Sequence, residues 1–171
     1  MTGNIAQTLA RLAEAQAAAG QPEATLGAVC DALAAAPGHK LFTVLVHHPD
    51  AGEVRRAFSN MPAEYPVGGA KPITDTAWAR QVLRRGEPYI GRDRDDIRSV
   101  FFDHELIRSL GCESALTLPV RWNGAVVAAL NLLHASGWYN GVDPGPLLPI
   151  AQFAVPAVQL MQEARPCRPS S

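Results

Sequence analysis

The segment from Cys112 to His134 constrains the fold more than any other part of this 171-residue chain. Two apolar runs flank Asn123-Gly124, a dipeptide that readily adopts the positive φ angles of a type I′ turn, so the segment predicts a β-hairpin. With a two-residue turn, the opposed pairs would be Trp122 and Ala125, Val120 and Val127, Leu118 and Ala129, and Leu116 and Asn131. Both faces of such a hairpin are too apolar for water, which predicts the centre of a sheet covered on both sides.

Composition and charge exclude several classes of protein. The chain is 47% hydrophobic with a net charge of −1, and its interspersed charges leave no basic face for nucleic acid or anionic lipid. No apolar run approaches the roughly 20 residues that span a bilayer. The first residues lack the pattern of a secretory signal, and three cysteines, at 30, 112 and 167, make no disulfide framework. These features predict a cytoplasmic protein that binds neither nucleic acid nor membranes.

The apolar periodicity predicts helices at both ends of the chain and strands between them. The predicted elements are helices near 5–12 and 26–33, strands at 39–48 and 53–59, a connection at 60–72, a helix around Trp78, a strand at 88–91, short helices at 95–101 and 103–110, the hairpin, and a last helix interrupted by Pro149 and Pro156. This order favours an α+β fold with an antiparallel sheet of five to six strands and helices on both faces. We expect an N-terminal helical element at 1–21, a domain at 22–162 and a disordered tail at 163–171.

The hairpin carries a resemblance to a known family. Its pattern, Ser114-x-Leu116-x-x-Pro119-Val120-x-x-x-Gly124-x-x-x-Ala128-x-Leu130-x-Leu132, is similar to the terminal hairpin of GAF domains, small-molecule sensors related to PAS domains. The first hairpin, the helix before Gly86 and the final helix follow in the same order, so the resemblance covers about residues 22 to 162. Ala128 departs from the pattern, because the family usually has glycine there.

The resemblance implies a stand-alone GAF sensor that forms a homodimer, acts on a separate output protein and binds a small molecule. In such domains one sheet face packs on helices and the other is roofed over a ligand pocket. We call the covering segments here, residues 60–72, the Trp78 helix and residues 95–110, the roof. The expected ligand is a small anionic or aromatic metabolite, with no cofactor and no metal. The candidate ligand-binding residues are Tyr65, Lys71, Trp78, Phe102, Asp103, His104, Cys112, Thr117, Asn131 and His134.

Lys71 is the roof residue of most interest. It follows Gly68-Gly69, where a tight turn can expose amides, and it precedes the rigid Pro72. Amides and an ammonium together suit a carboxylate or a phosphate. The alternative is a solvated loop lysine. Trp78 and Phe102 likewise have an alternative role as core-filling aromatics.

Polar residues of the last roof segment and the hairpin suggest a second set. Asp103-His104-Glu105, completed by His134, would supply acid–base groups or metal ligands, although adjacent helical residues point about 100° apart and Asp103 also suits an N-cap. The expected pairing sends Ser114 and Asn131 to one face of the hairpin and Thr117 and His134 to the other. Only one of those pairs could then line the pocket.

Two functions from different classes remain open. The favoured one is a sensor that binds its ligand without turnover. The alternative is a small enzyme that uses His104, Glu105, Lys71 or Cys112 as acid–base or nucleophilic groups. One GAF lineage, the free methionine-(R)-sulfoxide reductases, is enzymatic, but its clustered cysteines are missing here. Cys112 has the alternative role of a small buried residue.

Overall fold

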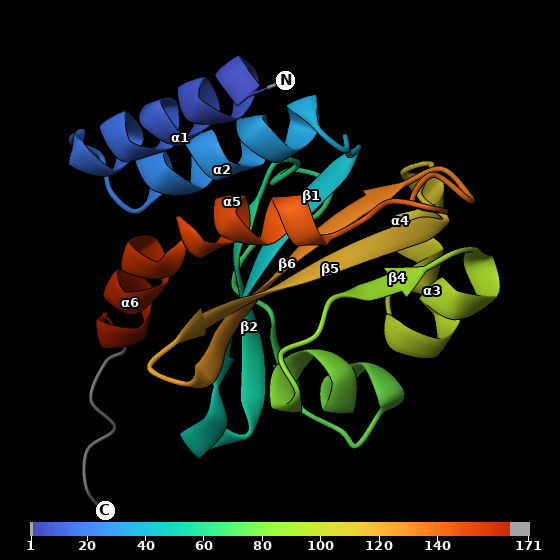
Figure 1. The fold of residues 1–171 in the computed structure, drawn as a ribbon. Coiled ribbons are helices and arrows are strands. Elements are labelled where there is room, and N and C mark those ends of the chain that lie inside the picture. Colours follow the sequence, from blue (N-terminus) through green and yellow to red (C-terminus); the bar gives the residue numbers. More distant parts are fainter. Residues whose placement is uncertain (1, 165–171) are drawn as a thin grey trace, which may run out of the picture.

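A six-stranded antiparallel sheet with the order β3-β2-β1-β6-β5-β4 forms the centre of the computed structural model, which describes residues 2–164 (Figure 1). The strands are β1 (Leu41–His48), β2 (Glu53–Ser59), β3 (Ala70–Pro72), β4 (Tyr89–Gly91), β5 (Ser114–Trp122) and β6 (Ala125–His134). The predicted hairpin, β5 and β6, is central together with β1. The predicted α+β class, strand number and central hairpin are therefore confirmed.

Helices precede, interrupt and follow the strands. They are α1 (Thr2–Ala17), α2 (Glu23–Ala35), the 3₁₀ turn η1 (Pro49–Ala51), the π-helical η2 (Ala79–Arg84), α3 (Arg94–Val100), α4 (His104–Ser109), the 3₁₀ turn η3 (Gly145–Leu147), α5 (Leu148–Gln152) and α6 (Val155–Glu163). The last helix breaks between α5 and α6, as its two prolines predict. None of the helices within residues 2–164 is long and apolar enough to cross a membrane. Most of the predicted tail, 165–171, lies outside the described residues.

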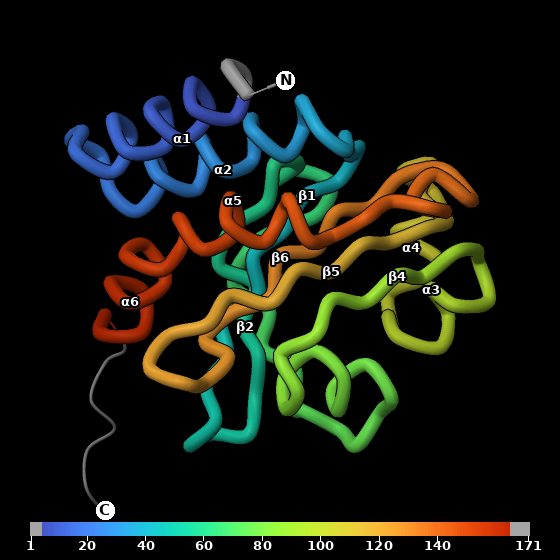
Figure 2. Tube along the Cα trace, viewed as in Figure 1, coloured from blue at the N-terminus to red at the C-terminus, as the bar shows by residue number. Residues whose placement is uncertain are grey.

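Both faces of the sheet are covered, but by different elements. On the helix face, α2, α5 and α6 pack on the strands, and α1 lies beside α2 as an outer layer (Figure 2). Phe42, Leu118 and Leu130 are completely buried there. On the roof face, η2, α3 and α4 cover the same strands and enclose two smaller apolar clusters around Ile107 and Val82. The sheet is therefore shared by two separate cores.

The register of the hairpin differs from the expectation. Trp122 pairs with Ala125 as predicted, but Val120 pairs with Ala128, because Val127 is an extra residue in a β-bulge. Beyond the bulge every pair is displaced by one residue, so Leu118 opposes Leu130. A one-residue displacement exchanges the faces of a strand. The faces predicted for residues 128–134 of β6, which follow the bulge, were therefore wrong.

The connection at 60–72 contains a strand that the sequence analysis missed. Residues Ala70–Pro72 form β3 at the edge of the sheet, where Lys71 pairs with Val54 of β2. Proline is tolerated on an edge strand because no further strand needs its missing amide. The pairing fixes the backbone at Lys71 and aims that side chain toward the roof face, beside Val54.

Candidate functional site

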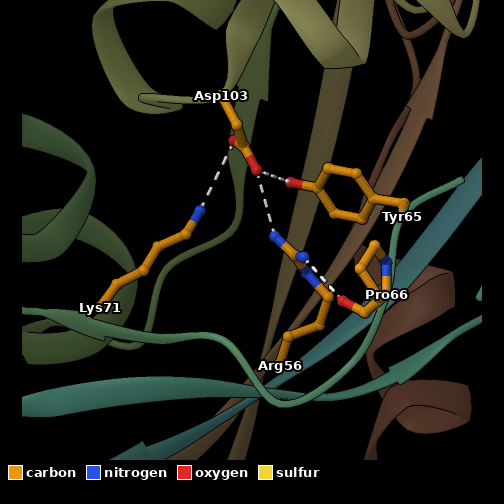
Figure 3. Close-up of polar contacts among 5 residues, drawn as sticks. All are labelled: Arg56, Tyr65, Pro66, Lys71 and Asp103. Carbon is orange, nitrogen blue, oxygen red and sulfur yellow. Dashed lines mark hydrogen bonds and ion pairs between the residues drawn. The ribbon is translucent and has the colours of Figure 1, made fainter.

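Three roof-face side chains, those of Arg56, Tyr65 and Lys71, converge on the carboxylate of Asp103, and we call these four residues the Asp103 cluster (Figure 3). The Tyr65 hydroxyl donates to Asp103 Oδ2 over 2.6 Å, and Arg56 Nη2 donates to the same oxygen over 3.2 Å. Lys71 Nζ lies 3.5 Å from the other oxygen, Oδ1. The Arg56 guanidinium also lies over the Tyr65 ring, 3.6 Å from its centroid. The cluster joins β2, the connection, β3 and the start of α4.

The Asp103 cluster is largely removed from water. The exposed fractions of the side chains are 9% for Arg56, 13% for Asp103 and 23% for Lys71. Burial, the hydrogen bond to Asp103 and its charge all raise the pKa of Tyr65, so this residue is a neutral hydrogen-bond donor. Burial lowers the pKa of Lys71, and the Asp103 carboxylate opposes that shift. With two cations and one carboxylate, the cluster carries one uncompensated positive charge.

The structure corrects the expected role of Asp103 and adds one residue to the site. Asp103 occupies the N-cap position of α4, but its side chain makes no capping bond there, because it is held by the cluster instead. Arg56 was missed. The alternation of β2 could have found it, because Val54 and Arg56 lie two residues apart and share the inward face. A charge at an inward strand position requires a partner.

A cavity of about 80 Å³ lies between the sheet and the roof beside Lys71. Trp78 also lines it, so two candidates from the sequence analysis meet there. The remaining lining residues are mainly apolar, with two threonines: Leu45, Val54, Pro72, Ile73, Thr74, Thr76, Ala79, Val100 and Phe101. Among the described lining residues, Lys71 alone carries a charge. A mostly apolar hollow with a few polar groups is typical of a small-molecule site.

A short polar chain lies buried next to this cavity. Trp78 Nε1 donates to Thr117 Oγ1 over 3.3 Å, and Thr117 Oγ1 donates to Asn131 Oδ1 over 2.7 Å. Thr117 and Asn131 are opposed in the observed register, so they share the roof face. The expectation that Asn131 pairs with Leu116 and faces away from Thr117 was wrong, because the bulge at Val127 displaces the pairing. These two hydrogen bonds hold the Trp78 ring against the sheet.

The aromatic candidates divide between the interior and the surface. Trp78 is 9% exposed and fills the interior together with Phe101. Phe102 is 75% exposed, and its ring centroid lies 4.1 Å from Lys71 Nζ, a cation–π contact that covers the ammonium. Phe102 therefore belongs to the surroundings of Lys71 and is not a core residue.

The two histidine candidates contact groups other than the Asp103 carboxylate. His104 Nδ1 lies 3.3 Å from the exposed Glu105 carboxylate. His134 pairs with Ser114 at the end of the hairpin and stacks on Trp138, with 3.6 Å between the ring centroids. In the part of the chain that the structure describes, no network of hydrogen bonds or ion pairs joins Asp103, His104, Glu105 and His134 into one set. Within residues 2–164, no group of three or more metal-ligating side chains is placed to hold a metal ion.

The described cysteines are buried thiols. Cys112 is 1% exposed in the apolar cluster around Ile107, and burial raises its pKa. Burial and the nearby charge of Asp31 raise the pKa of Cys30 to about 12. The thiolate is the nucleophilic form of cysteine, so both groups are unreactive as they stand. Cys167 lies outside the described residues.

Comparison with known proteins identifies the fold. No protein-family model and no curated protein matches the chain. Among solved structures, the GAF domain of an Acinetobacter phosphoenolpyruvate-protein phosphotransferase is similar with a TM-score of 0.68 at 13% identity, covering 95% of this chain and 96% of that one. Free methionine-R-sulfoxide reductase from Neisseria meningitidis, in complex with its substrate, gives 0.66 at 16% identity, with 94% and 92% covered.

A third structure is similar over nearly the whole chain. The phycoerythrobilin-bound GAF domain of a cyanobacterial phytochrome gives a TM-score of 0.63 at 16% identity, covering 96% of this chain and all of that one (100%). These likenesses extend over both the helix face and the roof face, at identities that establish the fold alone. The resemblance seen in the hairpin is thereby confirmed. The chain is a GAF-fold domain protein.

Proposed function

We propose that this protein is a cytoplasmic sensor that binds a small anionic metabolite between the sheet and the roof, without converting it. The observation that carries the proposal is the mostly apolar cavity that Lys71 lines as its one charged residue among those described. Two structures of the same fold hold a small molecule, a substrate in one and phycoerythrobilin in the other. The buried, protonated thiols and the separated histidines favour binding over chemistry.

The electrostatics of the site support an anion as ligand. Arg56 and Asp103 compensate each other, which leaves the charge of Lys71 available. An ion pair in a partly desolvated site is screened less than one at the surface. A neutral ligand would leave that charge without a second partner, whereas an anion would compensate it.

We further propose that the sensor is a homodimer formed through α1 and acts on a separate output protein. Helix α1 packs mainly on α2, and Ile5 on it is 60% exposed. Helices on the helix face and segments of the roof rest on the same strands, which gives ligand binding a physical route to the outer helices. Light scattering measures the oligomeric state of the wild type and of the Ile5→Glu variant. The variant should be monomeric at concentrations where the wild type is dimeric.

Native mass spectrometry and thermal unfolding test the proposed ligand binding. The protein as purified, and then mixed with a panel of small carboxylates, phosphates and neutral analogues, should bind an anion that is recovered with its mass unchanged. Lys71→Ala should lose the stabilisation by that anion. Lys40→Ala is the matched control, because Lys40 is the only other lysine and bonds the Gly111 carbonyl at the surface. Stabilisation that survives Lys71→Ala, or turnover of the bound compound, would contradict the proposal.

A further inference from the structure

The two oxygens of Asp103 are held unequally. Oδ2 accepts from both Tyr65 and Arg56 at hydrogen-bond distances. Oδ1 has no hydrogen-bond partner, and Lys71 approaches it only to 3.5 Å. Charge-assisted N–H···O bonds are usually about 2.7–2.9 Å long, so the contact with Lys71 is the loosest of the three. Asp103 would therefore remain anchored after Lys71 had left it.

Lys71 is the member of the Asp103 cluster that also lines the cavity. Its backbone is fixed by the pairing with Val54, while its long side chain turns about four single bonds. Phe102 covers the ammonium from the outer side. The same ammonium can thus reach either Asp103 or a negative group inside the cavity, without any movement of β3.

The cavity limits the size and the shape of an occupant. One water needs at least about 10–15 Å³ of such volume, so a cavity of about 80 Å³ holds roughly five to eight water-sized groups. Leu45, Val54, Val100 and Phe101 provide an apolar wall away from Lys71. These dimensions fit a molecule of a few carbon atoms with one charged end. A nucleotide or a large aromatic ligand would extend beyond this space.

We propose that the ligand is a short-chain monocarboxylate with an apolar tail, and that its carboxylate replaces Asp103 as the partner of Lys71. Asp103 keeps Tyr65 and Arg56 throughout. A single negative charge matches the single uncompensated positive charge of the cluster, whereas a doubly charged phosphate would exceed it. The exchange also breaks the ion pair between Lys71 of β3 and Asp103 at the start of α4. Ligand binding therefore removes one of the contacts that hold the roof in place. This inference rests on the proposed sensor function and specifies its ligand and its first structural step.

Lysine-selective carbon-13 NMR of the whole protein tests the exchange directly. The chain contains only Lys40 and Lys71, so each side chain gives a separate set of signals. Titration with sodium butyrate should shift the Lys71 signals, which are sensitive to the Phe102 ring, and leave those of Lys40 in place. Butyramide, which has the same shape without the charge, should shift neither. Equal binding of acid and amide, or an unmoved Lys71 signal on butyrate binding, would overturn the inference.

Two variants examine the competition between the carboxylates. Asp103→Asn removes the competing charge and should tighten butyrate binding by about fivefold, the effect expected for one partly exposed ion pair. Glu105→Gln removes a charge two residues away and should leave the affinity unchanged, which separates the exchange from a general change in potential. Weaker binding by a folded Asp103→Asn protein would show that Asp103 orients Lys71 for the ligand and would overturn the exchange. The wild-type NMR titration decides the matter if Asp103→Asn does not fold.

The failure of this inference and the failure of the proposed function have different signatures. If butyrate does not bind but inorganic phosphate or an aromatic acid from the ligand panel stabilises the protein through Lys71, the sensor stands and the monocarboxylate is wrong. If no small molecule in the panel stabilises the protein, both are wrong.

Discussion

At the scale of the residue, Asp103 shows how one side chain can suit two roles. An aspartate before a short helix has the sequence pattern of an N-cap, and the chain makes this bond at Asp93, whose carboxylate accepts from the amides of Asp95 and Asp96. At Asp103 three buried or half-buried donors compete for the carboxylate, and a buried cation without a partner is costlier than an uncapped helix end. The competition between Asp103's two roles is decided by residues up to 47 positions away in sequence.

The Asp103 cluster predicts a specific stability change. Asp103→Asn should lower the free energy of unfolding by about 3 kcal/mol, because Arg56 then stays buried without a compensating charge. Urea unfolding followed by circular dichroism measures the change. Glu105→Gln is the matched control with an expected change within about 0.5 kcal/mol, since Glu105 is 68% exposed at its side chain. Equal effects of the two substitutions would contradict a structural role for the cluster.

At the scale of the element, the sequence predicted which segments form strands and helices better than how the strands are paired. The apolar runs and the Asn123-Gly124 turn were sufficient for β5 and β6. The bulge at Val127 has no local signature, because Val126, Val127 and Ala128 are all small or β-branched apolar residues that fit either face. A second bulge places Ala57 outside the pairing of β1 with β2, and it sends Arg56 and Phe58 to opposite faces. The opposition of Thr117 and Asn131 depends on the register that follows the bulge at Val127, so it could not be derived from alternation alone.

Replacing either of two glycines by alanine should change the free energy of unfolding, and the two changes should have opposite signs. Gly124 has a φ of +77° in the hairpin turn, so Gly124→Ala should lower the free energy of unfolding by about 1–2 kcal/mol through backbone strain. Gly27 lies inside α2 with open space around its Cα, so Gly27→Ala should raise that free energy by about 0.5–1 kcal/mol. Urea unfolding of both variants measures the sign of each change in the free energy of unfolding. A stabilising Gly124→Ala would contradict the type I′ turn.

At the scale of the whole molecule, one sheet supports two cores of different character. The helix-face core is one continuous apolar cluster, whereas the roof face holds two smaller clusters joined by the polar Asp103 cluster and the cavity. The apolar hairpin predicted a sheet covered on both faces, and the resemblance to GAF domains implied the division into a helix face and a roof. They could not show where the cavity lies, because its walls come from strands, connection and helices whose approach depends on tertiary contacts. Lys71 and Trp78 were predicted as site residues from their residue types and their place in the roof, whereas Arg56 was overlooked although the alternation of β2 places it on the inward face.

The division into two cores predicts that the roof opens before the helix face does. Regions with few buried apolar contacts open at lower free energy than the global unfolding of a protein. Native-state hydrogen exchange in low denaturant should therefore give the amides of α4 a lower opening free energy than those of β1 and β6. Asp103→Asn should lower the opening free energies of the roof and of β1 by similar amounts, because both openings break the Asp103 cluster, the polar tie between β2, β3 and α4. Leu130→Ala, which removes a completely buried side chain from the helix face, should instead lower the values for β1 and β6 by several kcal/mol. If roof and central strands exchange with one common free energy in all three proteins, the two cores unfold as a single unit, and a ligand bound under the roof could not act by changing the roof alone.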